Sequence, residues 1–283
     1  MFRPHFVGTA LAVAHSLLLA LGPGPAGAAV SQPLKPVPSR LVAMAQAGEV
    51  RVCIWPDYHG ISYRNRKTLA LEGLDVDLAR ELGKDLGLAV RFVDSSFATL
   101  IDDVTGERCD IAMFGIGITP ARAEKLRFTT PHLRSDIYAV TTRGNRRIQQ
   151  WDDIDQPGVV VAVAKGTYHE PVMRSRLKAA SLLVLDTPQA REQEVAAGRA
   201  DVFMADYPFA RRLLEQVDWA RVVAPSAPYH LTPYAWVVKP GDDAWYARVE
   251  AFVTTIKQDG RLAAAAQRHG LGPIAVTSNT AAP

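Results

Sequence analysis

Asp110-Ile-Ala-Met-Phe-Gly-Ile-Gly-Ile-Thr-Pro-Ala-Arg122 combines an apolar strand with the start of a helix. The run 110–115 has the length and hydrophobicity of a buried strand. Thr119 and Pro120 are preferred at the N-cap and first position of a helix. Before this stretch the predicted elements alternate: strand 50–55, helix 75–86, strand 90–93 and helix 97–104. Strands that alternate with helices indicate an α/β unit with a parallel sheet covered by helices.

The same pattern begins again at Gly158-Val-Val-Val-Ala-Val-Ala164, an apolar run suited to a strand that is covered on both faces. The elements predicted after it are helix 171–177, strand 182–185, helix 190–197, strands 200–205 and 234–239, and helices 244–259 and 261–269. Two such units in 283 residues indicate two lobes with a cleft between them. Ligands of open α/β sheets bind at the carboxyl ends of the strands, so the residues that follow each strand are the candidates for a site.

Residues 1–28 have the features of a cleavable secretory signal peptide. Arg3 precedes an apolar stretch over 6–21, and Ala26-Gly-Ala28 is a small-x-small cleavage pattern. A membrane anchor is the weaker interpretation, because the apolar stretch is shorter than the ~20 residues of a membrane span. We therefore expect a periplasmic protein, with a tether of Ala, Pro and Ser residues over 29–46.

The formal charge of +3 is too small for this length to indicate binding to nucleic acid or to an anionic membrane. The only cysteines are Cys53 and Cys109. An even number in an exported protein is compatible with a disulfide, which needs Cα atoms within about 7 Å. The predicted strand positions make that distance doubtful. Two buried free thiols are the favoured interpretation, and the pairing stays open.

The stretch that opens this section also predicts a site for one carboxylate. Gly115 and Gly117 would let a ligand approach the backbone closely. Thr119 caps a helix whose first N–H groups carry a partial positive charge, and the Arg122 guanidinium can bind a carboxylate with two parallel hydrogen bonds. A plain capped helix with a surface arginine is the alternative.

A second helix start follows a strand at Lys165-Gly-Thr-Tyr-His-Glu170. If the lobes face each other, Thr167 and Tyr168 would lie in the cleft opposite the first helix start. The segment lacks the glycines and the terminal Lys-Ser/Thr of a nucleotide-binding loop. Gly166 alone could explain it as a simple turn.

Asp206 follows the apolar strand 200–205, where its carboxylate could receive an ammonium group. It could instead be the N-cap of a helix that begins near Pro208. Trp55, Tyr58 and Phe97 follow strands of the first unit and could wall the ligand, although each could equally be ordinary core. The histidines have no metal-ligand spacing, so we predict no metal site and no cofactor.

Together these segments resemble the family 3 extracellular solute-binding proteins, the polar amino-acid receptors of ABC importers. The resemblance extends over about 48–272. It is carried by the following segments: the helix Gly73–Leu86, the run Gly115–Arg122, Arg127-Phe-Thr-Thr-Pro131, the Gly-Thr-x-x-Glu turn at Gly166, and Ala205-Asp-Tyr-Pro208. It implies a type II periplasmic-binding-protein fold, with lobe 1 over 47–133 and 231–274 and lobe 2 over 134–230. Two hinge crossings would lie near His132 and Tyr229, and 275–283 would be a disordered tail.

The resemblance also implies roles for the site residues. Arg122 would bind the α-carboxylate of an amino acid, helped by the backbone of Gly115, Gly117 and Thr167, and Asp206 would bind the α-ammonium. The protein would be a monomer that delivers its ligand to an ABC permease. Glycine at 117 departs from the family, which usually has a hydroxyl residue there. Trp55 is also unusual, so the ligand's side chain stays open.

An enzyme on the same scaffold is the alternative function. Cyclohexadienyl dehydratases resemble this family, and Ile154-Asp-Gln-Pro-Gly-Val159 is similar to a stretch found in them. Glu170 falls where those enzymes place a general acid, which would need a raised pKa in a dry pocket. A Gly-Thr-x-x-Glu turn is also common in plain binding proteins, so the binding function is favoured.

Overall fold

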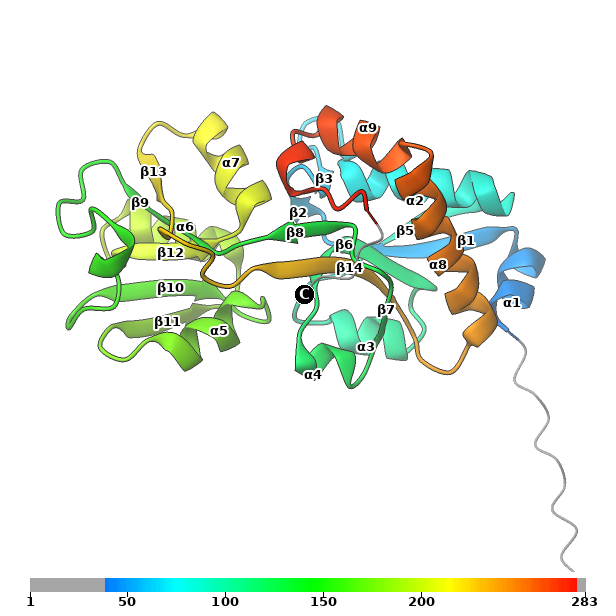
Figure 1. Ribbon diagram of the computed structural model, residues 1–283, viewed down its shortest axis with the longest axis horizontal. Helices are drawn as coiled ribbons and strands as arrows, with labels where there is room; N and C mark the ends of the chain where they lie inside the picture. Colours follow the sequence, from blue (N-terminus) through cyan, green and yellow to red (C-terminus); the bar gives the residue numbers. More distant parts are fainter. Residues whose placement is uncertain (1–38, 279–283) are drawn as a thin grey trace, which may run out of the picture. The chain divides into compact units, whose positions relative to one another are not determined.

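The computed structural model describes residues 39–278, and these contain two main sheets (Figure 1). The predicted signal peptide, 1–28, lies outside the described residues, as does most of the predicted tether. Within 39–278, no helix is long and apolar enough to cross a membrane.

The first sheet has six strands in the order β5-β1-β6-β14-β7, with β8 also paired to β14. Its strands are β1 (Glu49–Ile54), β5 (Ala89–Asp94), β6 (Ile111–Gly117), β7 (Arg127–Phe128), β8 (Leu133–Ser135) and β14 (Thr232–Val238). β1 is parallel to both β5 and β6, and β14 is antiparallel to β6. Every residue of β6 is buried, as expected for a central strand covered on both faces.

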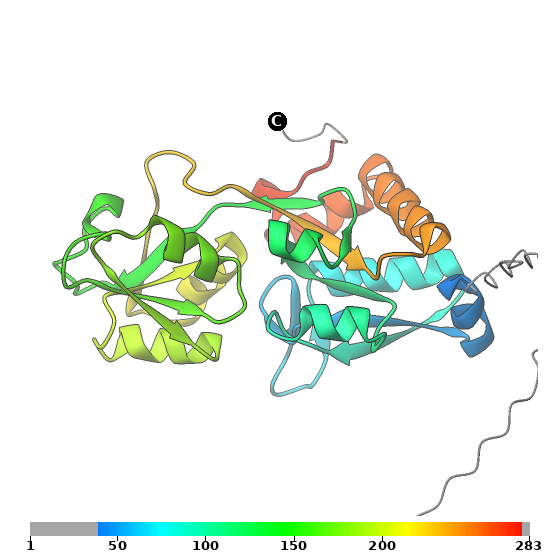
Figure 2. The same ribbon diagram turned by 90° about the horizontal axis from the view of Figure 1, so that it is seen from below.

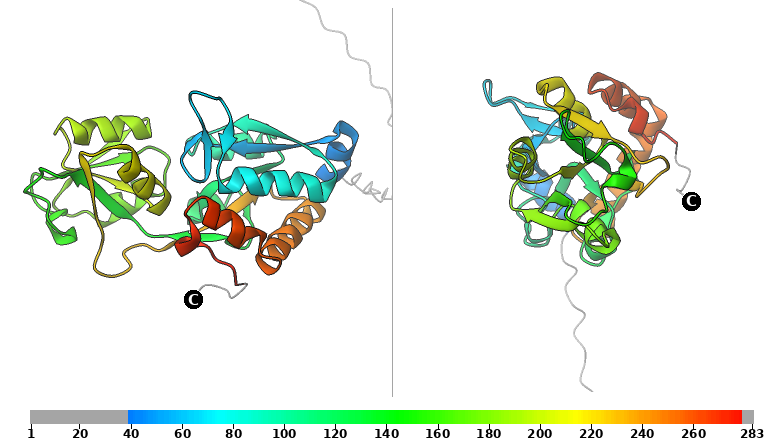
Figure 3. Two further views of the ribbon diagram at one scale, coloured as in Figure 1. Left: turned by 90° about the horizontal axis from the view of Figure 1, so that it is seen from above. Right: turned by 90° about the vertical axis from the view of Figure 1, so that its left-hand side faces the viewer.

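The helices of this lobe cover both faces of its sheet. The chain leaves β1 through α2 (Leu74–Leu86) toward β5 and returns through α3 (Leu100–Thr105) toward β6. Right-handed crossovers in opposite directions place these two helices on opposite faces. α2 lies with α8 (Asp243–Gln258) and α9 (Arg261–Arg268) on one face (Figures 1 and 3). A small sheet of β2 (Asp57–Tyr58), β3 (Ser62–Arg64) and β4 (Leu71–Glu72) follows β1.

The second sheet has five strands in the order β11-β10-β12-β9-β13. The strands are β9 (Tyr138–Thr142), β10 (Val160–Ala164), β11 (Ser181–Leu185), β12 (Val202–Ala205) and β13 (Ala220–Val223). The helices are α5 (His169–Arg176), α6 (Pro188–Ala196) and α7 (Tyr207–Gln216), and η1 (Trp151–Asp153) is a short 3₁₀ turn. The predicted α/β fold class with two lobes is confirmed.

Two connections join the sheets. The chain leaves the first sheet after β8 and enters the second at β9, and it returns from β13 into β14. β8 and β14 pair with each other, so the connections run side by side (Figure 2). The outward connection therefore begins after Ser135, slightly beyond the predicted boundary at residue 133.

Three local predictions are corrected by the structure. Part of the predicted tether forms α1 (Arg40–Ala47), whose N-cap Ser39 also bonds to Asp242. The loop predicted after Pro56 contains β2 and β3. The predicted tail, 275–283, begins with paired residues, since Ala275 forms a bridge to Leu133 and the Val276 N–H donates to the His132 carbonyl (2.9 Å) after η2 (Gly272–Ile274).

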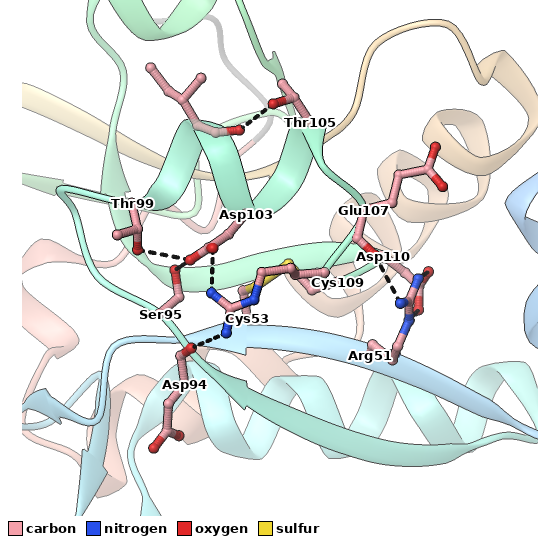
Figure 4. Close-up of a disulfide and its surroundings, with 12 residues drawn as sticks. Arg51, Cys53, Asp94, Ser95, Thr99, Asp103, Thr105, Glu107, Cys109 and Asp110 are labelled. Atoms are coloured by element: carbon pink, nitrogen blue, oxygen red, sulfur yellow. Dashed lines mark hydrogen bonds and ion pairs between the residues drawn. A yellow bond between two sulfur atoms is a disulfide. The ribbon is translucent and has the colours of Figure 1, made fainter.

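The preference for free thiols is wrong, because Cys53 and Cys109 form a disulfide with Cα atoms 5.6 Å apart (Figure 4). The prediction took both cysteines as buried residues of neighbouring strands. The register pairs Val52 with Ile111, so a straight strand would have carried residue 109 away from Cys53. Cys109 instead lies in the turn between α3 and β6, and this turn brings it back to β1.

Candidate functional site

The carboxyl end of β6 is held in place by a buried hydrogen-bond network. The Asp75 carboxylate of α2 accepts from the Gly115 N–H (2.7 Å) and from Trp236 Nε1 (2.9 Å), and it lies 3.1 Å from His132 Nε2. All three side chains in this network are fully buried. Gly73 makes the close approach of α2 possible, because a Cβ there would lie 2.3 Å from the Ile61 carbonyl oxygen. The segment Gly73–Leu86 thus fixes the backbone at the carboxyl end of β6.

Arg122 lies in α4 (Pro120–Ala123), a single turn whose N-cap Thr119 accepts from the Arg122 N–H (3.3 Å). Only 6% of the residue is exposed. Its guanidinium donates to the Gly117 carbonyl (2.8 Å) and, in the second lobe, to the Gly166 carbonyl (2.9 Å). Burial lowers the pKa of Arg122 to about 10, so the side chain remains a cation at neutral pH.

Asp206 follows β12 in the second lobe and is 3% exposed. Its carboxylate accepts hydrogen bonds from the hydroxyls of Tyr58 and Tyr234 in the first lobe (2.7 Å for Tyr234), and from the Phe209 N–H (3.2 Å). It is therefore both the N-cap of α7 and a buried charge that faces the other lobe. Burial and the Asp206 charge raise the pKa of both tyrosines, which keeps their hydroxyls protonated as donors.

A small cavity lies between these elements. The residues that line it come from both lobes: Trp55, Tyr58, Phe97, Gly115, Thr167, Tyr168, His169, Arg191, Asp206 and Phe209. Its wall is largely aromatic. The centre of the Trp55 ring lies 5.2 Å from the centre of the Tyr58 ring and 5.1 Å from that of Phe97, so these three rings pack together. This combination of apolar walls and a few buried charges is typical of a small-molecule site.

Residues 50–272 match the profile of the bacterial extracellular solute-binding proteins, family 3. The chain belongs to this family. The matched range contains all of the predicted site residues and both main sheets.

The relatives of this solute-binding protein include an enzyme and binding proteins. It is 32% identical over 225 residues to the cyclohexadienyl dehydratase of Pseudomonas aeruginosa, with 79% of this chain and 83% of the relative covered. The structure of the ancestral amino acid-binding protein AncCDT-1, described as a precursor of cyclohexadienyl dehydratase, has a TM-score of 0.75 and 28% identity, with 81% of this chain and 99% of that one covered. A putative ABC-transporter binding component from Wolinella succinogenes, complexed with lysine, has a TM-score of 0.72 and 28% identity, with coverages of 78% and 95%.

The structure brings most of the predicted site residues to the cavity of this solute-binding protein. Those that line it are Trp55, Tyr58, Phe97, Gly115, Thr167, Tyr168 and Asp206. Arg122, Gly117 and Thr119 are not among its lining residues. Arg122 lies directly behind the aromatic wall, with its Cζ 5.3 Å from the centre of the Phe97 ring.

Glycine at 117 has a steric reason in this structure. A Cβ there would lie 3.0 Å from Thr232 Cγ2 and 3.3 Å from Tyr168 Cδ1. The Tyr168 ring thus occupies the space that a hydroxyl side chain at 117 would need.

Glu170, the candidate acid of the enzymatic alternative, does not line the cavity. Its carboxylate accepts from the Gly166 N–H (3.2 Å) and from Arg174 (3.0 Å) at the start of α5. The preceding residue, His169, faces the cavity instead. Burial and the nearby Arg191 charge lower the pKa of His169 well below its usual value, so the ring is neutral.

Sequence reasoning missed three residues of the cavity: His169, Arg191 and Phe209. A signal for Arg191 was present, because Arg191 and Val195 are four residues apart on α6 and so share a face of that helix. Val195 belongs to the apolar core of the lobe, which would have predicted that Arg191 also points inward.

Proposed function

We propose that the protein, in the periplasm, binds an amino acid or similar small zwitterion between its two lobes and delivers it to an ABC permease in the inner membrane. The observation that carries this proposal is a pair of opposite buried charges from opposite lobes, Arg122 and Asp206, beside one aromatic-walled cavity. A ligand with a carboxylate and an ammonium would complement both. Family membership and the lysine-bound structural relative support this class of ligand.

Binding would act through closure of the two lobes. Each lobe supplies one charge, so a zwitterion that contacts both stabilises the closed arrangement over the open one. The Arg122 guanidinium already reaches the second lobe at Gly166, and Tyr58 reaches Asp206 in the same way. A permease would then recognise the closed form.

A calorimetric and thermal-shift screen of the exported protein tests this function. Twenty amino acids, their decarboxylated amines and their deaminated acids would be compared, because a ligand that binds only the folded state raises the melting temperature. We expect binding by one class of amino acids, and Asp206→Asn should weaken that class more than it weakens the matching deaminated acids. Equal losses of affinity for amino acids and for deaminated acids would show that Asp206 does not bind the ammonium group.

The second candidate function is dehydration of a cyclohexadienyl acid, favoured by the 32% identity to the Pseudomonas aeruginosa dehydratase. The geometry of the described residues gives it less support. Among the described residues, Asp206 is the only carboxylate that lines the cavity, and it accepts from two tyrosines and a backbone N–H. The Glu170 carboxylate accepts from the Gly166 N–H and from Arg174 outside the cavity, so using it as an acid would require the side chain to leave both partners.

An assay with prephenate and arogenate separates the two functions. Turnover that survives repeated purification and disappears in Glu170→Gln would establish the enzyme. We expect no turnover, with prephenate at most competing for the cavity. Arg174→Gln is the control, because it removes the partner of Glu170 and leaves its carboxyl group in place.

A further inference from the structure

Arg191 is a second buried guanidinium, and neither the proposed roles nor the scaffold accounts for it. It projects from α6 into the second lobe's side of the cavity, and only 3% of the residue is exposed. Arg122 belongs to the other lobe and lies behind the aromatic wall. The cavity therefore has one cationic group in its lining and another behind its wall.

The position of Arg191 is fixed by two aromatic rings and one carbonyl. Its Cζ lies 4.4 Å from the centre of the Phe209 ring and 5.0 Å from that of Phe203. Nη1 donates to the Met204 carbonyl at 2.6 Å. These contacts hold the guanidinium in one orientation, so a partner would meet a preorganised group.

The same contacts leave most of the guanidinium's donors unused. A guanidinium has five N–H donors, and among the described residues the one hydrogen bond of this side chain is that from Nη1. Nε is buried without a hydrogen-bond partner, and Glu192 and Asp206, the carboxylates whose charges act on Arg191, form no ion pair with it among the described residues. Burying a cation in this way is costly unless an anion compensates it.

The charges around the cavity indicate what that anion is. Among the residues that line the cavity, Asp206 is the one carboxylate that faces Arg122 and Arg191, and His169 is neutral. The charge of Glu192 also acts on Arg191, but Glu192 lines a separate pocket. A ligand with one carboxylate and one ammonium would leave one guanidinium uncompensated. A basic side chain, as in lysine, would add a further positive charge beside Arg191.

We propose that Arg191 binds a second carboxylate of the ligand, which makes dicarboxylic compounds the preferred class. This inference rests on the proposed function, since it assigns the first carboxylate to Arg122. Two sources share the chemistry: an acidic α-amino acid, whose ammonium would meet Asp206, and a dicarboxylate without an amino group. Glutamate and glutarate, which have the same two carboxylates, distinguish them.

Calorimetry of the full exported protein tests the proposal with nearly isosteric ligand pairs. The pairs are glutamate with glutamine and aspartate with asparagine, and glutarate and arginine complete the set. We expect the acid of one pair to bind at least about tenfold more tightly than its amide, a difference of about 1.4 kcal/mol. Arg191→Gln should bring that ratio close to one. Arg199→Gln, which removes an exposed arginine paired with Glu194 in the same lobe, should preserve it.

Three results would overturn the inference. In one, the wild-type protein binds the amides or arginine at least as tightly as it binds the acids. This result would contradict the role of Arg191 but not the proposed function. Another is an acid-to-amide ratio that survives Arg191→Gln. The last is an equal loss for acids and amides in Arg191→Gln, which would make Arg191 the site of the first carboxylate or a structural residue.

The test does not depend on one variant being folded. Circular dichroism shows whether Arg191→Gln is folded. If it is not, Arg191→Lys replaces it, because this variant keeps the charge and should retain part of the preference for acids. The acid-to-amide ratio of the wild-type protein can also refute the proposal by itself. Binding of glutarate without glutamate would support Arg191 and contradict the ammonium role of Asp206. Absence of binding by every compound of this set would contradict the inference about Arg191, whereas the screen of twenty amino acids decides the proposed function separately.

Discussion

At the scale of single residues, the site is defined by two buried charged side chains, Arg122 and Asp206, whose hydrogen-bond partners are all uncharged. Arg122 has two carbonyl partners and Asp206 has two tyrosine hydroxyls and one N–H. These neutral partners hold each charge in position without neutralising it. Ligand groups of opposite charge therefore gain strongly by binding there.

Arg122→Ala should weaken binding of the true ligand by about 2–5 kcal/mol, because the ligand carboxylate would be desolvated without a charged partner. Arg122→Lys should recover part of this loss, since it restores the charge without the paired N–H donors. Calorimetry measures both. Arg127→Ala is the control, as it removes an arginine that pairs with Asp243 away from the cavity. Unchanged affinity in Arg122→Ala would show that the carboxylate binds elsewhere.

His59 gives the protein a pH dependence that can be measured without the ligand. Burial and the nearby Arg212 charge lower the pKa of His59 to about 4 from a usual 6.5. Between these values the unfolded chain binds a proton that the folded chain does not, so stability falls as the pH drops from about 6.5 to about 4. Urea unfolding at several pH values should show a smaller fall in His59→Gln. An identical fall in the variant would contradict the assignment.

The predicted site residues that line the cavity are those that follow strands. Asp206, Tyr58 and Phe97 follow strands, and the carboxyl ends of parallel strands meet at one edge of a sheet. Arg191 and His169 lie on helices. The direction in which a helical side chain points depends on how the helix packs against other elements, and the local sequence does not show this packing. Arg122 is buried, and its depth behind Phe97 depends on contacts between the lobes.

At the scale of elements, long periodic segments were predictable and short ones were not. The amphipathic helix α2 and the apolar strand β10 carry their signal within one segment. Strands such as β2 and β7 have two residues each, and pairing alone defines them. The disulfide was missed for the same reason, since the turn after α3 determines where Cys109 lies.

Loss of the disulfide should destabilise the first lobe by about 2–4 kcal/mol, because the bond closes a loop between residues 56 apart in sequence and so restricts the unfolded chain. Urea unfolding with and without reductant measures the change. The double variant Cys53→Ser with Cys109→Ser should show the lower stability and no response to reductant. A double variant that still responds to reductant would point to a cause other than this bond.

At the scale of the whole described chain, function depends on how closely the lobes approach at a few points. One such point is Gly166 of the second lobe, which has a φ of +76°. A Cβ on Gly166 would lie 2.9 Å from the Cα of Ala98 in the first lobe. Since backbone cannot yield as a flexible side chain can, a methyl group here would act as a wedge between the lobes.

Gly166→Ala should therefore weaken ligand binding by about ten- to a hundredfold, the equivalent of a packing clash of about 1–3 kcal/mol. Most of the loss should appear as faster dissociation, because the open form still admits the ligand.

Gly198→Ala is the matched control in the same lobe. Its φ of +71° imposes similar backbone strain, but its Cβ would meet no atom within 4 Å. Both variants should lose comparable thermal stability without ligand, and small-angle scattering should show incomplete closure only in Gly166→Ala. Equal affinities in the two variants would mean that Ala98 moves aside and that this contact does not limit closure.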